Sequence, residues 1–257
     1  MALSSLWRFK TKLNKNKTII KLKTMNTEKN QVPQCDKTAV SGSPFSEVYL
    51  MDCMDLMAKY PDNYFDLAVV DPPYGIGMDN QKVRVKPNRP NSYLRAGEKQ
   101  YNTTDWDSKP PDKEYFKELF RVSKNQIIWG ANYFCEHLPS GKGWIYWDKQ
   151  MGENNFSSGE FAYQSMQTKS SSFSEPSMRV SGTRIHPTQK PIYLYDWIFK
   201  NYATEGMKIL DTHLGSGSSR ISANKAKLNF VGCEIDKEYF DKSKKRYDDF
   251  VSQVRLW

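Results

Sequence analysis

Residues 208–220, KILDTHLGSGSSR, decide the fold class of this chain. They consist of a short apolar run, a turn with two glycines and the start of a helical pattern, an arrangement that brings backbone amides close to a nucleotide-like ligand. Glu234 follows seventeen residues after Gly217, at the end of another apolar run, where an acid can bind both hydroxyls of a ribose. With Asp211 before the glycines, the segment predicts a nucleotide-like ligand at the ends of two strands.

A dinucleotide-binding fold is the main competitor for this segment. The third glycine of G-x-G-x-x-G would fall at position 220, which is Arg220. A bulky side chain at this point is incompatible with the close packing that a pyrophosphate needs. NAD is therefore disfavoured as the ligand.

Apolar runs and helical patterns alternate from Phe45 onward. Most of the apolar runs are short and nearly continuous, as expected for strands that are buried on both faces. We expect seven strands, at 48–51, 66–71, 126–129, 144–147, 160–164, 208–211 and 230–234. We expect helices at 53–59, 112–122, 131–138, 189–202, 218–226 and 236–250. The alternation predicts an α/β layer architecture with a mostly parallel sheet.

Length and composition are those of a globular protein with one domain or at most two. The 257 residues are 38% hydrophobic and 26% charged, with a mean hydropathy of −0.74, and no run approaches the ~18 apolar residues that a membrane span requires. The four cysteines lie far apart, without a CxxC pair or a histidine in ligand spacing. We expect no membrane segment, no metal site and no disulfide framework, but reduced thiols in a cytoplasmic protein.

The net charge of +9 is concentrated at the N-terminus. Residues 1–24 hold seven basic side chains and no acid, which leaves 31 basic against 29 acidic groups in the remainder, so the body of the chain is close to neutral. We expect residues 1–43 to be a basic, disordered tail and residues 44–257 to be the folded domain. Three interpretations of the tail are open: translation starts at Met25, which we favour, the tail is a flexible arm that touches phosphates, or it is a transit segment.

The stretch 67–75, LAVVDPPYG, is the sharpest chemical feature of the sequence. Ligands of α/β sheets bind at the carboxyl ends of strands, and a buried strand ends here at Asp71. The Asp71 carboxylate and the Pro72 carbonyl can each accept one hydrogen of a planar exocyclic amine, and Tyr74 can stack on the ring that carries this amine. The alternative interpretation is a plain strand end followed by a stiff turn.

A third motif, HPTQKP at residues 186–191, precedes an amphipathic helical pattern. Thr188 can cap that helix, and Lys190 can pair with a ligand carboxylate. Taken alone, the segment is better explained as an ordinary helix entry.

These three motifs, in this order, closely resemble those of S-adenosylmethionine-dependent DNA amino-methyltransferases, which methylate adenine N6 or cytosine N4. DPPY resembles their catalytic motif, which in N4-cytosine members more often begins with Ser, while HPTQKP and DTHLGSGS resemble their cofactor motifs. The catalytic motif precedes the cofactor glycines, as in the circularly permuted beta class. Residues 121–130, 144–149 and 231–236 resemble phage-type adenine methyltransferases. The resemblance covers residues 46–250 and implies a Rossmann-like methyltransferase fold that methylates adenine N6 in double-stranded DNA.

The resemblance also implies roles for individual residues. The target base would be held by Asp71, Pro72, Pro73 and Tyr74. The cofactor, S-adenosylmethionine, would be bound by Asp52, Asp211, His213, Gly215, Gly217, Glu234, Thr188, Gln189 and Lys190. Many relatives carry Pro-Phe where this chain has Thr212 and His213, so His213 either packs on the cofactor or only fills space.

The implied reaction is direct methyl transfer to a neutral amine, without a covalent enzyme intermediate. The target base lies inside the duplex and must be flipped out, at a cost of roughly a few kcal/mol. Residues 76–110 and 150–182 are candidate DNA-contact loops. The first contains a candidate phosphate-binding set, for which an ordinary solvated loop is the alternative: Lys82, Arg84, Lys86, Arg89, Arg95 and Lys99.

Alternatives to an adenine-specific enzyme are an N4-cytosine methyltransferase, an RNA adenine methyltransferase and a catalytically idle DNA-binding relative. Only about forty residues separate Trp147 from His186, which is too few for an independent recognition domain. The bases must therefore be read by the two loops or by a partner. Restriction-modification with a cognate restriction enzyme, phage self-protection and orphan regulation are all open settings. The recognition sequence and the oligomeric state do not follow from the sequence.

Overall fold

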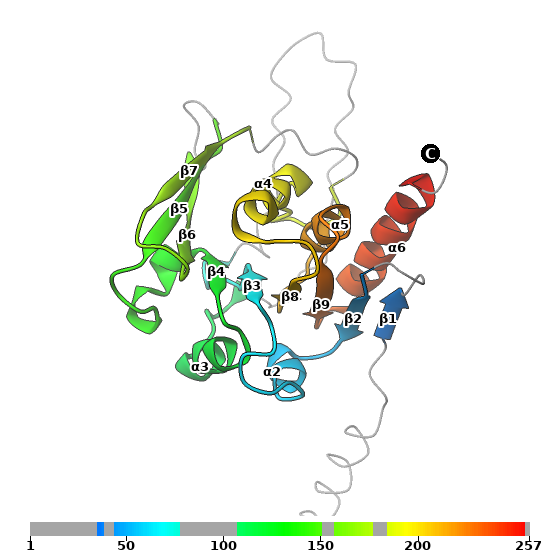
Figure 1. The fold of residues 1–257 in the computed structure, drawn as a ribbon, viewed down its shortest axis with the longest axis horizontal. Coiled ribbons are helices and arrows are strands. Elements are labelled where there is room, and N and C mark those ends of the chain that lie inside the picture. The colour runs from blue at the N-terminus through cyan, green and yellow to red at the C-terminus, as the bar shows by residue number, and fades with distance from the viewer. Residues whose placement is uncertain (1–34, 39–43, 78–106, 151–156, 177–183, 255–257) are drawn as a thin grey trace, which may run out of the picture. The chain divides into compact units, whose positions relative to one another are not determined.

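A computed structural model describes residues 35–38, 44–77, 107–150, 157–176 and 184–254 (Figure 1), all of which belong to the unit Cys35–Trp257. The strands in these residues are β1 (Cys35–Thr38), β2 (Ser46–Leu50), β3 (Leu67–Val70), β4 (Gln126–Trp129), β5 (Gly143–Asp148), β6 (Gly159–Gln164), β7 (Ser171–Ser174), β8 (Lys208–Asp211) and β9 (Asn229–Glu234). The helices are α2 (Cys53–Met57), α3 (Lys113–Val122), α4 (Ile192–Tyr202), α5 (Ser218–Lys225) and α6 (Lys237–Val254), with 3-10 turns η3 (Ala131–Tyr133) and η4 (Cys135–His137).

The nine strands of the described residues form one sheet in the order β1-β2-β9-β8-β3-β4-β6-β5-β7. Neighbours are parallel from β2 through β9, β8 and β3 to β4 and again between β5 and β7, whereas β1 and β6 run antiparallel to their neighbours. The predicted α/β fold with a mostly parallel sheet is confirmed. The predicted number of seven strands is wrong, because β1 and β7 are short polar edge strands without the apolar run that marks the other seven.

Helices cover both faces of this sheet, as Figure 1 shows. Successive side chains of a strand point to opposite faces, so Leu67 and Val69 of β3 join the core on the side of α4, while Ala68 and Val70 join the core on the side of α2 and α3. Both faces of the central strands are therefore buried from solvent. This explains why their sequences are continuously apolar instead of alternating.

The chain changes direction across the sheet between two neighbouring strands, β3 and β8. From β3 it continues through α3 to β4 on one side, and from β8 it continues through α5 to β9 on the other side. At such a switch point the loops after the two strands diverge and leave a crevice at the carboxyl edge of the sheet. The fold thus predicts a ligand site between Asp71, which follows β3, and the glycine turn, which follows β8.

The segment 131–138, predicted as a helix, forms the two 3-10 turns η3 and η4. They follow Gly130, whose φ of 69° lies in the left-handed region that favours glycine. The ring of Tyr74 lies so close to Gly130 that a Cβ there would collide with it. The backbone turns away sharply after β4 at this point, and a regular helix does not form.

Helix α4 begins at Ile192 instead of at residue 189. Its N-cap is Pro191, which has extended backbone angles, and the residue before a proline is disfavoured in the helical region. Thr188, predicted as the cap, instead shares a hydrogen bond of 3.1 Å with Nδ1 of His186. The HPTQK segment therefore forms a turn before the helix, in which the amide of Gln189 donates to the carbonyl of His186 at 3.2 Å, and its side chains line a cavity.

Strand β1 belongs to the sheet, although the sequence placed its residues in the tail. Arg220 of α5 donates from Nη1 to Asp36 of β1 at 2.8 Å and from Nε to the hydroxyl of Ser46 in β2 at 2.8 Å. Its guanidinium carbon also lies 3.8 Å from the ring centroid of Tyr247. Arg220, whose bulk made a dinucleotide ligand unlikely, thus joins the edge of the sheet to helix α6. Residues 1–34 and 39–43 lie outside the described residues.

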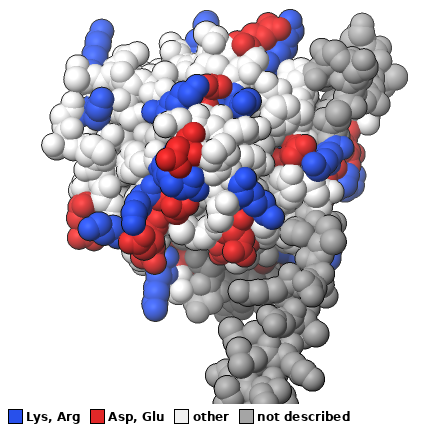
Figure 2. All heavy atoms as spheres, turned by 60° about the horizontal axis from the view of Figure 1, so that its bottom comes forward, with Lys and Arg blue, Asp and Glu red and all other residues white. Residues whose placement is uncertain are grey.

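Charges of both signs are intermingled on the surface. On the face shown in Figure 2, Lys and Arg side chains lie beside Asp and Glu side chains across the described residues. Ion pairs such as Lys124–Asp66 at 2.7 Å and Arg121–Glu118 at 2.8 Å are typical of the described surface. This distribution agrees with the near-neutral body expected from the sequence. Among the helices described, none is long and apolar enough to cross a membrane.

Candidate active site

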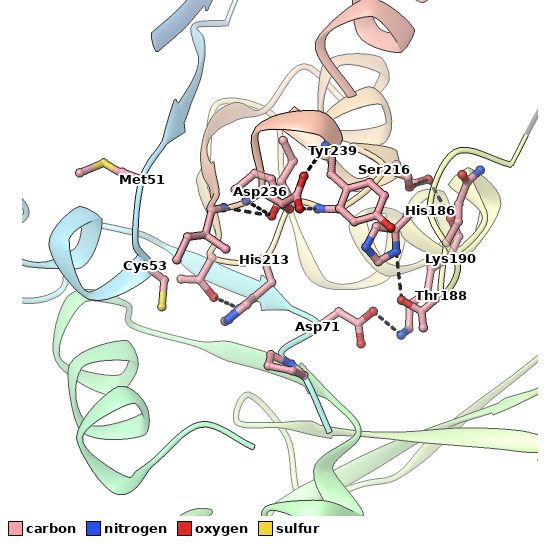
Figure 3. Close-up of a pocket in the computed structure, with 18 of the residues that line it drawn as sticks. Met51, Cys53, Asp71, His186, Thr188, Lys190, His213, Ser216, Asp236 and Tyr239 are labelled. Atoms are coloured by element: carbon pink, nitrogen blue, oxygen red, sulfur yellow. Dashed lines mark hydrogen bonds and ion pairs between the residues drawn. The ribbon is translucent and has the colours of Figure 1, made fainter. Parts of the chain in front are cut away.

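A cavity of about 260 Å³ lies at the carboxyl edge of the parallel strands, at the switch point between β3 and β8 (Figure 3). The segments after β2, β3, β8 and β9 line it, together with the turn before α4. Nine predicted site residues lie on its wall: Asp52, Asp71, Pro73, Thr188, Gln189, Lys190, His213, Gly215 and Glu234. Four others are not part of the wall: Pro72, Tyr74, Asp211 and Gly217. The structure therefore brings together three motifs that are far apart in the sequence.

The cavity wall also contains residues that the sequence did not single out as site residues: Met51, Cys53, His186, Tyr195, Thr212, Leu214, Ser216, Ser218, Ile235, Asp236 and Tyr239. Ile235 is 66% exposed. It directly follows Glu234, the predicted ribose-binding acid, and this position could have identified Ile235 as an apolar contact of the ligand. Tyr195 and Tyr239 come from α4 and α6, and only the packing of these helices brings them to the cavity.

The glycine turn after β8 is held by an acid at the end of β9. Gly215 and Gly217 have φ values of 52° and 70°, which a residue with a Cβ rarely adopts. One carboxylate oxygen of Glu234 accepts from the amide of Gly215 at 2.8 Å, and the other accepts from the amides of Ile235 and Asp236 at 3.0 Å. Burial raises the pKa of Glu234, and these amide hydrogen bonds act in the opposite direction. The turn and the acid thus form one preorganised unit.

Two further predicted acids serve as local anchors of the backbone. Asp211 is buried behind the glycine turn, where it accepts from the hydroxyl of Ser219 at 2.5 Å and from the amide of His213 at 3.0 Å. Burial raises the pKa of Asp211 to about 7. Asp52 lies on the cavity wall and caps α2 by accepting from the amide of Met54 at 2.7 Å.

Asp71 and Tyr74 of the DPPY motif are directly bonded to each other. The Tyr74 hydroxyl donates to Oδ1 of Asp71 at 2.6 Å, and burial holds the pKa of this phenol well above its usual value, so it stays a donor. Its ring stacks on Tyr133 with centroids 5.1 Å apart and planes 17° apart. Tyr133 is 47% exposed. An aromatic stack that reaches the surface therefore lies next to the carboxylate.

Lys190 contacts two carboxylates. Its Nζ lies 2.5 Å from Oδ2 of Asp71 and 3.1 Å from Oε2 of Glu160, which is the second residue of β6. The other oxygen of Glu160 is 2.5 Å from Nζ of Lys149. Burial alone would lower the pKa of Lys190, but the charges of Asp71 and Glu160 outweigh it and raise this pKa. No motif in the sequence marks Glu160 as a site residue.

Both histidines beside the cavity are neutral at pH 7. Burial lowers the pKa of His186 to about 3, with Lys190 as a further cause, and lowers the pKa of His213 to about 4. His213 shares a hydrogen bond of 2.9 Å with Thr212, whose hydroxyl also contacts that of Tyr115 at 2.7 Å. The wall of the cavity is therefore free of imidazolium charge.

Gln189 presents an unused hydrogen-bond donor. Its Oε1 accepts from the amide of Ile185 at 2.9 Å, which fixes the orientation of the side-chain amide. Its Nε2 is buried and has no partner among the described residues. A buried donor of this kind is costly unless a ligand or a water accepts from it, and Gln189 lies on the cavity wall.

The predicted phosphate-contact residues Lys82, Arg84, Lys86, Arg89, Arg95 and Lys99 lie outside the described residues, as do most of the 76–110 loop and part of the 150–182 loop. In the second loop, β6 and β7 are described, so residues 171–174 are strand and not irregular loop. No cluster of three metal-ligating side chains is found in the part of the chain that the structure describes.

Comparisons with known proteins identify the class. The family model described as DNA methylase of the N6/N4 type matches residues 126–245. The Type II methyltransferase M2.MboI of Moraxella bovis is 21% identical, with 81% of this chain and 89% of the relative covered. The putative methylase YubD of Escherichia coli (strain K12) is 24% identical, with 73% and 84% covered.

Solved structures agree on the fold. M1.HpyAVI in complex with SAM is similar with a TM-score of 0.50, at 19% identity and with 77% of this chain and 97% of that chain covered. The cytosine-N4-specific PvuII DNA methyltransferase is similar with a TM-score of 0.52, at 11% identity and with 81% and 92% covered. The fold is thus that of the S-adenosylmethionine-dependent methyltransferases. Over residues 126–245 the chain is similar to the N6/N4 family of DNA methyltransferases, and over most of its length it is similar to Type II methyltransferases.

Proposed function

We propose that this chain is a DNA adenine methyltransferase, which transfers a methyl group from S-adenosylmethionine to the N6 amine of a flipped-out adenine in double-stranded DNA. The observation that carries the proposal is that Asp71, the first residue of DPPY, lies on the same cavity wall as Gly215 and Glu234. Similarity to the N6/N4 DNA methylase family over residues 126–245 supports methylation of an amine. The initial Asp, where N4-cytosine relatives more often carry Ser, favours adenine.

The cavity wall fits S-adenosylmethionine, the cofactor of this family. A carboxylate has about four acceptor positions. Three backbone amides occupy three of those of Glu234, so one position is left to accept from a ribose hydroxyl. Ile235 offers an apolar surface for the adenine ring of the cofactor, and Nε2 of Gln189 offers a donor to its carboxylate end. When bound, the cofactor supplies a methyl group on a positively charged sulfur. The neutral His186 and His213 add no repelling charge to this site.

Asp71 is the residue that would orient the target amine. Its carboxylate accepts one N–H of the amine and the carbonyl of Pro72 accepts the other, which directs the nitrogen lone pair toward the methyl group. Holding the reacting atoms in this way can supply several kcal/mol of the barrier reduction. As the new N–C bond forms, the S–CH3 bond of a bound cofactor would break and leave S-adenosylhomocysteine, a neutral thioether. The methylated amine would then lose its extra proton to Asp71, the carboxylate bonded to it. Tyr74, fixed by its hydrogen bond to Asp71, offers its ring as a stacking surface for the base.

The test compares the wild-type chain with Asp71→Asn, using labelled S-adenosylmethionine and mixed-sequence double-stranded DNA, followed by digestion to nucleosides and mass spectrometry. We expect N6-methyladenine with the wild type and at least a thousandfold less with Asp71→Asn, since about 10⁵ of effective concentration can depend on orientation. Cofactor binding, measured by calorimetry, should change little. Asp66→Asn is the matched control. Asp66 lies directly before β3, whereas Asp71 lies directly after it, and Asp66 pairs with Lys124 away from the cavity.

Each outcome separates one alternative. N4-methylcytosine would keep the mechanism and replace the base. Transfer to RNA alone would replace the substrate. DNA binding without cofactor binding would identify an idle relative. We place the enzyme in the cytoplasm, with a cognate restriction enzyme as a partner to be sought among neighbouring genes.

A further inference from the structure

The antiparallel strand β6 brings an acid to the edge of the sheet where the parallel strands end. β6 pairs antiparallel with β4, with Ala162 opposite Trp129, the last residue of β4. The first residues of β6 therefore lie at the carboxyl edge of β4 and, one strand further, close to the end of β3. This placement explains how Glu160 and Asp71 reach the same ammonium group, although 89 residues separate them in the sequence.

Lys190 is surrounded by oxygens of the protein, and its contact with Oε2 of Glu160 is an ion pair without hydrogen-bond geometry. Its ammonium carries three donor hydrogens, and three oxygens lie within reach: Oδ2 of Asp71 at 2.5 Å, Oε2 of Glu160 at 3.1 Å and the hydroxyl of Tyr74 at 3.1 Å. Its side chain is 5% exposed. The expected contact between Lys190 and the methionine part of the cofactor is thus replaced by contacts with the catalytic motif, as Figure 3 shows for Asp71.

The cluster of Asp71, Lys190, Glu160 and Lys149 contains two carboxylates and two ammonium groups. A buried cation with only one counter-ion is costly, and additional hydrogen-bonding partners reduce this cost. Burial would raise the pKa of Glu160, but the two lysines outweigh it and lower this pKa. Glu160 therefore stays ionised and holds Lys190 in place even when Asp71 exchanges partners with a substrate.

We propose that Glu160 is a positioning residue for methyl transfer: it holds Lys190 against Asp71, so that the ammonium orients the catalytic carboxylate instead of binding the cofactor. This inference rests on the proposed function, because it assigns Asp71 to the target amine. Glu160 itself touches neither the base nor the cofactor. Its effect on the reaction passes through Lys190, and a misplacement of about 1 Å in such a group can cost a hundredfold in rate.

The experiment measures kcat, the KM for DNA and the Kd for S-adenosylmethionine for the wild type, Glu160→Gln and Lys190→Met. We expect kcat to fall about tenfold to a hundredfold in Glu160→Gln, with the cofactor Kd and the KM for DNA within about twofold of wild type. Lys190→Met should lower kcat further, again without weakening cofactor binding. In the double variant Glu160→Gln, Lys190→Met, the two losses should not multiply, because both act on one contact chain.

A matched control and a milder variant keep the test decisive. Asp36→Asn removes the acid from another buried ion pair, that of Asp36 with Arg220, and should lower the melting temperature without changing kcat. Should Glu160→Gln fail to fold, Glu160→Asp keeps the charge on a shorter side chain and should give an intermediate kcat.

Three outcomes would overturn the inference. An unchanged kcat in Glu160→Gln would show that Lys190 needs no second anchor. A cofactor Kd that rises as much as kcat falls would return Lys190 to the cofactor. A KM for DNA that rises at constant kcat would make Glu160 a contact of the base. A wild-type enzyme that methylates no base, tested in the same assay, would instead overturn the proposed function, and the inference with it.

Discussion

Lys190 and Arg220 are both buried cations, with side chains 5% and 1% exposed, but their surroundings differ. The partners of Arg220 are Asp36, Ser46 and the ring of Tyr247, none of which lines the cavity. The partners of Lys190 include Asp71, which does line it. Arg220 and its partners therefore lie away from the cavity, whereas Lys190 and Asp71 line it.

The difference shows what each cation contributes. A buried ion pair is weak evidence for stability, because desolvation offsets most of the attraction, whereas removal of one partner is strongly destabilising. Among the described residues, the contacts of Arg220 join β1 and β2 to α5 and α6, so loss of Arg220 should reduce stability. Lys190 contacts Asp71 on the cavity wall, so loss of Lys190 should lower the rate of methyl transfer.

The largest loss of stability is expected from Arg220→Met. This variant leaves Asp36 buried beside Lys244, which is 3.4 Å away and partly exposed, and we expect the free energy of unfolding to fall by about 3 kcal/mol. Methylation per folded molecule should be unchanged, because no partner of Arg220 lines the cavity. Urea unfolding and an activity assay at low temperature measure the two quantities. A loss of kcat in fully folded protein would remove the distinction between the two cations.

Asp211, a buried acid without an ion-pair partner among the residues that the structure describes, should show a pH effect on stability. The pKa of Asp211 is raised from its ordinary 3.8 to about 7 by burial, so its contribution to stability is fully present below pH ~3.8 and is lost as the pH rises through 7. In Asp211→Asn this loss is absent. Relative to wild type, the variant should gain on the order of 4 kcal/mol between pH 4 and pH 8.

Melting temperatures at several pH values, measured for both proteins without ligands, test this expectation. Parallel pH profiles for wild type and Asp211→Asn would show that Asp211 is ionised throughout the range. In that case the hydrogen bonds that Asp211 accepts from Ser219 and from the amide of His213 outweigh the effect of burial.

The smallest effect is expected at the outer end of the Lys190 cluster. Lys149 pairs with Glu160 and lies over the ring of Trp147 at 5.5 Å from its centroid. Lys149→Met keeps this packing and leaves Lys190 as the cation of Glu160. We expect kcat to fall by about twofold to fivefold and the free energy of unfolding to change by no more than about 1 kcal/mol. A larger loss of kcat than in Lys190→Met would show that Lys149 acts on the reaction more directly than Lys190 does.

Much of the fold could be predicted because the central strands are buried on both faces. Continuous apolar runs such as 67–70 and 126–129 have no alternative environment in a chain of this size, and the structure places both in the sheet. The strands β1 and β7 could not be found in this way. At an edge of the sheet, a strand such as Ser171–Ser174 is stabilised by backbone pairing with one neighbour and needs no apolar sequence.

The candidate site was predictable where a motif combines strand end, turn and chemistry. Asp71 and Pro73 of DPPY and Gly215 of the glycine turn line the cavity, as expected from their positions after strands. Lys190 was found, but its partner was not, because Glu160 reaches it only through the antiparallel pairing of β6 with β4. A contact that depends on the order of strands in a sheet has no signature in the local sequence.

The two edge strands also bear on how this protein behaves at high concentration. An edge presents unpaired amide and carbonyl groups that can template pairing with another molecule, and natural sheets limit this risk with short, polar or charged edges. The outer strands here are four residues each, CDKT and SSFS, and carry one large apolar side chain between them. Growth of the sheet from molecule to molecule, the first step toward a fibril, is therefore disfavoured at both ends.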